Sequence, residues 1–129
     1  MNIQRKFGKT AKCLWHDRKR FMGMPLSFTR YYLIEDPTWV KMFVETGLTY
    51  SEIEEVNLYR ICDISFHQGL AGKMFNTGTV ILKSSDESKP TLVLKNVKNP
   101  YQVRDMIADL VEREKTVHGV RVTEFHGHN

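Results

Sequence analysis

The fold of this 129-residue chain is decided by residues 58–85, LYRICDISFHQGLAGKMFNTGTVILKSS. Within this stretch, residues 61–67 alternate between polar and apolar side chains. Such alternation is typical of an antiparallel strand with one face in the core. We expect the apolar face to point inward, and it consists of Cys62, Ile64 and Phe66. Residues 79–84 include three consecutive apolar residues, which predicts a return strand covered on both faces.

A glycine-bearing connection joins these two strands and carries the apolar residues Leu70, Met74 and Phe75. Gly78 stands just before the return strand. A glycine at such a position indicates either a positive φ angle or the close approach of another segment.

Further strands are predicted on both sides of this pair, from alternation and from aromatic and β-branched residues. Pro37 is placed for the second position of a turn, and Gly47 closes a tight hairpin. The glutamates of residues 49–58 also suit a helix surface, but their apolar stripe is thin, so we predict a strand there. The additional strands are residues 26–34, 39–46, 49–58 and 91–95, with a seventh around residues 13–15.

A helix is predicted from residue 100 to about Val117, where the hydrophobic period changes to three and four. Asn99 is expected to cap it, Pro100 to occupy its first position, and Gly119 to end it. The stripe comprises Tyr101, Val103, Met106, Ile107, Leu110, Val111 and Glu114. Together these elements predict a mainly β protein: a seven-stranded antiparallel barrel, or two orthogonal sheets, capped by one C-terminal helix.

The bulk composition suits a single domain with a substantial core, since 41% of the residues are hydrophobic. We place the domain at residues 12–118, after a flexible basic segment at residues 1–11 and before a tail at residues 119–129. The net charge is +4, and residues 1–20 hold seven basic residues against one acidic residue. Two cysteines, no apolar leader and no bilayer-length apolar run lead us to expect a cytoplasmic protein.

Four short strings in the chain resemble a bacterial pleckstrin-homology-like (PH-like) domain family. They are GMPLSFTRY at residues 23–31, EVNLYRICDI at 55–64, FNTGT at 75–79 and KNP at 98–100. The resemblance spans roughly residues 12–115 and implies a seven-stranded PH-like barrel with a C-terminal helix, here as a stand-alone soluble member. The role of that family is largely undefined, so the resemblance implies a fold rather than an activity.

Candidate contacts for an anionic surface lie near the N-terminus, and they are Lys12, Arg18, Lys19 and Arg20. In lipid-binding eukaryotic PH domains a basic motif around the first hairpin holds phosphate. Here the corresponding turn contains Glu35 and Asp36, which oppose a phosphoinositide head group. The alternatives for the basic cluster are weak contact with an anionic membrane and a solvated loop.

Candidate residues for a protein interface are apolar residues that fall in connections between strands. They are Phe21, Met22, Met24, Met74 and Phe75. We therefore predict a non-enzymatic binding or assembly module that contacts a protein partner or a second copy of itself. The alternative is a peripheral adaptor that binds anionic membrane lipid through the basic N-terminal segment.

Catalytic and cofactor sites are not predicted. Asp63, Ser65 and His67 share one strand face, but a triad needs the histidine between the other two residues and an oxyanion site beside them. No zinc-ligand spacing and no glycine-rich phosphate loop is present, so we expect no metal, no cofactor and no small-molecule substrate. The basic residues do not interleave with aromatic residues across a sheet, so we expect no nucleic-acid partner.

Overall fold

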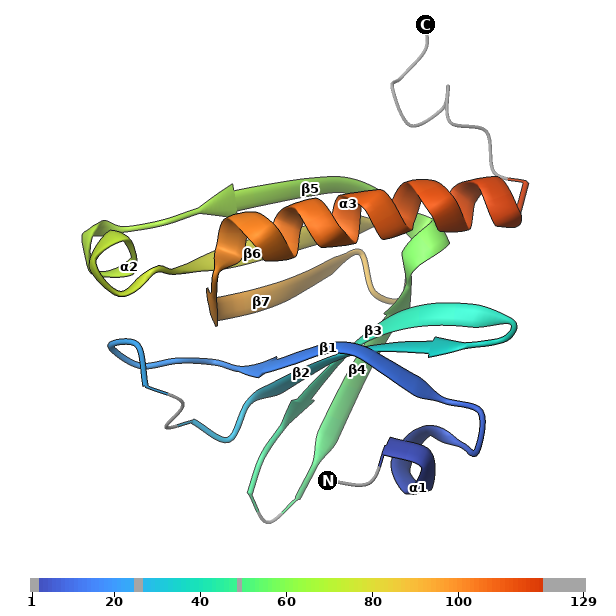
Figure 1. The fold of residues 1–129 in the computed structure, drawn as a ribbon, viewed down its shortest axis with the longest axis horizontal. Coiled ribbons are helices and arrows are strands. Elements are labelled where there is room, and N and C mark those ends of the chain that lie inside the picture. Colours follow the sequence, from blue (N-terminus) through green and yellow to red (C-terminus); the bar gives the residue numbers. More distant parts are fainter. Residues whose placement is uncertain (1–2, 25–26, 49, 120–129) are drawn as a thin grey trace, which may run out of the picture.

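Two antiparallel sheets and a long C-terminal helix make up the computed structural model, which describes residues 3–24, 27–48 and 50–119 (Figure 1). The four-stranded sheet has the order β1 (Lys12–Arg18), β2 (Arg30–Asp36), β3 (Trp39–Thr46), β4 (Glu52–Asn57). The three-stranded sheet has the order β5 (Ile61–His67), β6 (Thr77–Ser84), β7 (Thr91–Lys98). The helices are α1 (Ile3–Phe7), α2 (Leu70–Phe75) and α3 (Pro100–Val117), with a 3₁₀ turn at Leu58–Arg60.

The predicted mainly β, PH-like architecture is confirmed, in the form of two sheets rather than a closed barrel. The predicted strand at residues 39–46 is β3, and the predicted helix is α3, which begins at Pro100 and ends at Val117. The seventh strand is longer than predicted, because β1 extends from Lys12 to Arg18 along β2.

The inward position predicted for Cys62 is wrong, because a β-bulge lies between Ile61 and Asp63 in β5. The bulge turns Cys62 out to solvent and leaves Ile61 fully buried. A bulge adds one residue on one strand, so the alternation changes sides at that point. The face toward the core is therefore Ile61, Ile64 and Phe66.

Three other local predictions need correction. The connection between β5 and β6 contains the helix α2. Asn99, the predicted cap of α3, makes no side-chain cap; it has a positive φ of 51°, and its side chain accepts a hydrogen bond from Asn76 at 2.6 Å. The segment predicted to be flexible contains α1, because Phe7 packs 4.7 Å from the Phe43 ring. The predicted tail, apart from Gly119, lies outside the described residues, and the domain boundaries at 12 and 118 stay predictions.

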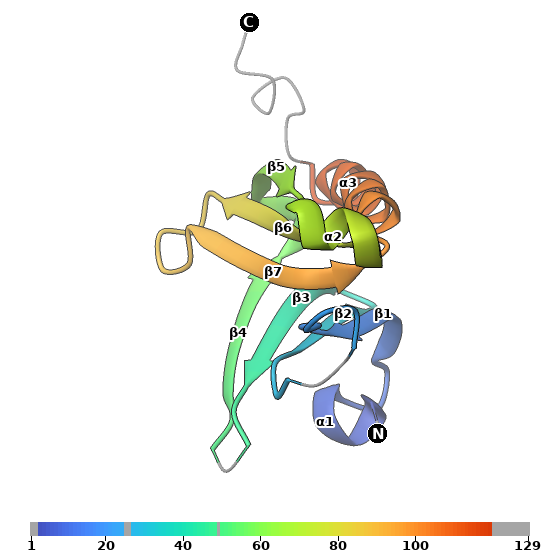
Figure 2. The ribbon, with the colours of Figure 1, turned by 90° about the vertical axis from the view of Figure 1, so that its left-hand side faces the viewer.

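Strand β2 is buried on both faces, which sets the layers of the molecule (Figure 2). Tyr31 and Leu33 face the main core between the two sheets, which α3 completes with Ile107. Tyr32 and Ile34 face outward into a second apolar cluster, which includes Ala11 and Phe43 and is covered by Ile3 and Phe7. The short helix α1 thus covers the outer face of the four-stranded sheet.

Gly78 packs at the junction of β5, β6 and α3. Its φ is not positive, so the second of the two sequence-based alternatives, close approach, is confirmed. A methyl group at this position would lie 2.9 Å from Phe66 Cε1 and 3.1 Å from Pro100 Cβ. Glycine therefore lets the first turn of α3 rest directly on the sheet.

Gly78→Ala is expected to lower the free energy of unfolding by about 1–3 kcal/mol, because the added methyl group displaces Phe66 and Pro100. Urea denaturation measures this loss. The control is Gly69→Ala, where the added methyl group meets open space, so that only the weaker N-cap preference of alanine at the start of α2 is lost, at less than about 1 kcal/mol. Equal effects at both positions would contradict the close-packing interpretation.

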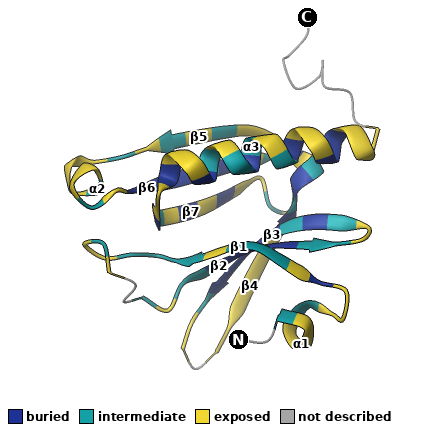
Figure 3. Cartoon of the chain, viewed as in Figure 1, coloured by how far each residue is buried: buried dark blue, intermediate teal, exposed yellow. Residues whose placement is uncertain are grey.

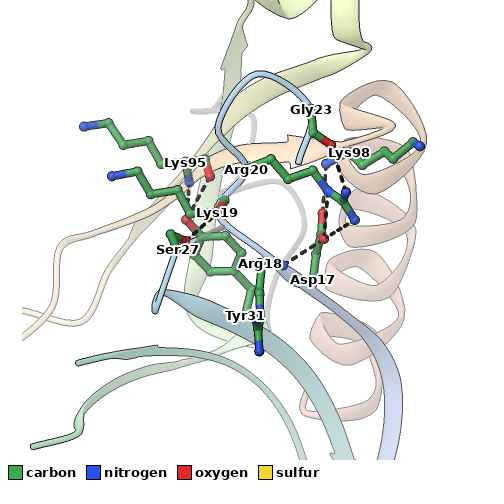
Figure 4. Close-up of polar contacts among 9 residues, drawn as sticks. All are labelled: Asp17, Arg18, Lys19, Arg20, Gly23, Ser27, Tyr31, Lys95 and Lys98. Carbon is green, nitrogen blue, oxygen red and sulfur yellow. Dashed lines mark hydrogen bonds and ion pairs between the residues drawn. The ribbon is translucent and has the colours of Figure 1, made fainter. Parts of the chain in front are cut away.

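Side-chain hydrogen bonds join the two sheets where β1 and β2 meet β7 (Figure 4). The Tyr31 hydroxyl donates to the Lys95 carbonyl at 2.9 Å and accepts from the Lys95 N–H at 2.8 Å. The Asp17 carboxylate accepts from the Lys98 N–H at 2.8 Å and pairs with Arg20 at 3.0 Å. We call this set of contacts among Asp17, Arg20, Tyr31, Lys95 and Lys98 the seam.

Tyr31→Phe is expected to lower the free energy of unfolding by about 1–3 kcal/mol, because it leaves the backbone groups of Lys95 without their partner. The matched control is Tyr32→Phe, since the buried Tyr32 hydroxyl has no hydrogen-bond partner among the described residues. Removing an unpaired buried hydroxyl leaves stability unchanged or raises it. Chemical denaturation compares the two variants, and a loss at Tyr32 as large as at Tyr31 would refute this account.

The stability that Tyr31 contributes is also expected to depend on pH. Burial raises the pKa of Tyr31 from 10.0 to about 12, and the nearby Asp17 charge adds to this, against the backbone hydrogen bond with Lys95. Because the folded-state pKa is above the unfolded one, this contribution is full below pH 10.0 and is lost as the pH rises through about 12. Urea titrations on either side of this range should show the stability advantage of wild type over Tyr31→Phe shrinking.

Candidate functional site

The loop between β1 and β2 lies beside α2 at one end of the molecule (Figures 1 and 2). Phe21 and Met24 exchange backbone hydrogen bonds of 2.9 and 3.0 Å, which makes a tight turn with positive φ at Met22 and Gly23. A methyl group on Gly23 would lie 3.2 Å from Phe75 Cδ1. The turn therefore rests on the α2 side chain Phe75, although the two segments are far apart in the sequence.

This contact brings exposed apolar residues from two segments together. The exposed fraction is 63% for Phe21 and 77% for Met74, and the other members are similarly accessible (Figure 3). We call this surface the apolar end, and it consists of Phe21, Met22, Met24, Leu70 and Met74. Four of these residues were predicted as interface candidates, and the fifth candidate, Phe75, is half-buried because it supports Gly23.

The four predicted anion contacts do not form one group. Lys12 lies opposite Glu35 at the start of β1, six residues or about 20 Å along the strand from Arg18. Arg20 is held in the seam by Asp17 and donates to the Gly23 carbonyl at 3.2 Å, so it positions the turn. Of the set, Lys19 points outward beside Lys95 (Figure 4).

Three lysines near the apolar end were missed by sequence reasoning. Lys73 stands next to Met74 on α2, while Lys95 and Lys98 are exposed on β7. Together with Lys19, their ammonium groups form no ion pair with any residue that the structure describes. The β1–β7 seam brings Lys19 and Lys95 together on one side, and Lys98 extends to the other side (Figure 4). Their separation in sequence hides this arrangement. The apolar end is therefore flanked by unpaired positive charge.

A depression of about 620 Å³ lies at a different place, between the β2–β3 turn and the last turns of α3. Four of its polar lining residues contact one another: Arg113 lies 2.9 Å from Glu35 and 3.6 Å from Glu114, and His118 lies 3.4 Å from Glu114. The Tyr59 ring stacks on His118 at 4.5 Å. The arrangement is a network of ion pairs that joins α3 to the hairpin turn.

The residues Asp63, Ser65 and His67 are exposed on β5, and none of them lines this depression. The sequence did not predict the depression, since Glu114 read as the last member of the helical stripe. The exposed positions of Asp63, Ser65 and His67 on β5 agree with a solvated sheet surface.

None of the helices in the described part of the chain combines the length and hydrophobicity needed to cross a bilayer. No curated protein matches the chain, and no solved structure matches it either. The family described as bacterial PH domain matches residues 24–111, which is more than half of the chain. The two-sheet architecture with its C-terminal helix fits that match, and the chain belongs to the bacterial PH domain family.

Proposed function

We propose that this protein is a non-catalytic binding module that contacts another protein through the apolar end. The observation that carries the proposal is the packing of the turn at Gly23 against Phe75, which brings two segments with five exposed apolar side chains to one end of the molecule. Single exposed apolar residues are ordinary on a protein surface, but several gathered in one region are typical of an interaction site.

The apolar end is also held in position before any partner binds. The seam fixes the base of the turn through Arg20, whose N–H donates to the Asn96 carbonyl at 2.9 Å. A surface ordered in advance loses less conformational entropy on binding. Burying one large apolar side chain contributes roughly 1.5–3 kcal/mol, so a few of these residues suffice for a specific contact. The three methionines allow the surface to adapt to the shape of its partner.

Several observations favour binding over catalysis. The family consists of PH domains, which are generally binding modules. Arg113 of the depression is engaged by Glu35 and Glu114, and Asp63, Ser65 and His67 are exposed on β5 outside the depression. The membrane alternative through the N-terminal segment is less favoured, because Lys12 lies far from Arg18 and Arg20 is engaged with Asp17.

The proposal is tested by photo-crosslinking in the cells that express the protein. A photoreactive p-benzoylphenylalanine at Met74 is expected to give a covalent adduct with a protein, because Met74 is 77% exposed within the apolar end. The control places the same residue at Val93, which is exposed on β7 outside this surface.

Mass spectrometry identifies the adducts. Protein adducts at position 74 and few at position 93 would support the proposal. Equal yields at both positions, or lipid adducts alone at position 74, would contradict it.

A further inference from the structure

A second exposed apolar group lies on the β3–β4 hairpin. The exposed fractions are 72% for Leu48, 86% for Tyr50 and 49% for Ile53. Glycine is required where this hairpin turns, because Gly47 has a φ of 109° and a methyl group there would lie 1.8 Å from the Tyr50 carbonyl oxygen. In Figures 1 and 2 this hairpin projects away from α2 and from the three-stranded sheet.

The hairpin presents negative charge around these apolar residues. Glu52 forms no ion pair within the described part of the chain. Glu55 pairs with Lys41, but the glutamate side chain is 48% exposed and the lysine 24%. Glu54 pairs with Lys89, and here too the glutamate side chain is the more exposed, at 49% against 28% for the lysine. In both pairs the carboxylate is the outer member, so the surface that a partner meets is acidic.

The hairpin and the apolar end are therefore complementary in two respects. Each carries exposed large apolar side chains, and one is flanked by glutamates while the other is flanked by Lys19, Lys73, Lys95 and Lys98. Opposite potentials on two apolar surfaces guide association and select the partner. Because the hairpin points away from α2, one molecule cannot bring its own two surfaces together (Figure 2).

We infer that the apolar end binds the β3–β4 hairpin of a second copy of this chain, so that copies associate head to tail. This inference rests on the proposed function and names the partner of the same surface. A contact between two different surfaces leaves one of each free at the ends of any pair, so association continues until a ring closes or a filament forms. Exposed edge strand β4 lies within the contact, where backbone pairing can add to it.

Two double variants of the full chain test the inference, each altering one surface. The end variant is Lys73→Glu with Met74→Ser, and the hairpin variant is Tyr50→Ser with Glu52→Lys. All four side chains are exposed, so circular dichroism should show an unchanged fold. In sedimentation velocity, wild type is expected to exceed the mass of a dimer as concentration rises, while each variant keeps the mass of one chain.

An equimolar mixture of the two variants gives the sharpest readout. Each variant retains the surface that the other has lost, so the mixture is expected to form a dimer and nothing larger. The matched control is Lys83→Glu with Val93→Ser, two exposed positions outside both surfaces, which should assemble like wild type.

The inference is overturned if wild type stays a single chain at every concentration, if either surface variant assembles normally, or if the mixture does not pair. If one of these results is obtained and position 74 still crosslinks to a different protein, the inference fails and the proposed function stands. If position 74 gives no protein adduct, both the proposed function and the inference fail.

Discussion

The arrangement of this molecule depends on the hydroxyl of Tyr31, which holds both backbone groups of Lys95 at once. The two sheets do not continue into one another through a backbone ladder on this side, so the side chains of Tyr31 and Asp17 make the connection, together with one backbone hydrogen bond from the Arg20 N–H to the Asn96 carbonyl. Asp17 makes a second connection of this kind, because its carboxylate accepts a hydrogen bond from the backbone N–H of Lys98, further along β7. A single buried phenol and a single carboxylate thus supply the register that strand pairing supplies elsewhere.

The seam also decides what the basic N-terminal region does. Asp17 is the lone acidic residue among residues 1–20, and it forms an ion pair with Arg20. Arg20 therefore contributes little to the surface charge and instead hydrogen-bonds the turn that carries Met22. Of the four lysines that flank the apolar end, Lys19 belongs to the basic N-terminal region, and the other three come from α2 and β7. The positive charge beside that surface is therefore gathered from three segments by the topology of the chain.

Features encoded over short stretches were predictable, and features made by contacts between distant segments were not. The period of residues 100–117 and the turn residues Pro37 and Gly47 gave α3 and the β2–β3–β4 succession. Alternation alone could not reveal the bulge that exposes Cys62, because a bulge depends on the partner strand. Helix α1 has only five residues, which is too short to show a helical period in the sequence. It is held by the contact between the rings of Phe7 and Phe43.

The candidate site divides in the same way. Loop position identified Phe21, Met22, Met24 and Met74 as accessible, since apolar residues outside strands have few places in a core. Their common surface and its lysines required knowledge of which loop meets which helix. The Arg113–Glu35 ion pair was hidden for the same reason, because Arg113 lies on α3 and Glu35 on β2.

The two apolar layers on either face of β2 differ in how firmly they are closed. The inner one is shut by a whole sheet and an 18-residue helix, whereas the outer one is covered by a five-residue helix. An isolated helix of that length has almost no stability in water. Helix α1 is therefore stabilised by the packing of Phe7 and by the Lys6–Glu45 ion pair of 2.5 Å. We therefore expect local opening of the outer layer to need less free energy than opening of the inner one, and such opening would hydrate the Tyr32 hydroxyl, which is buried without a partner among the described residues.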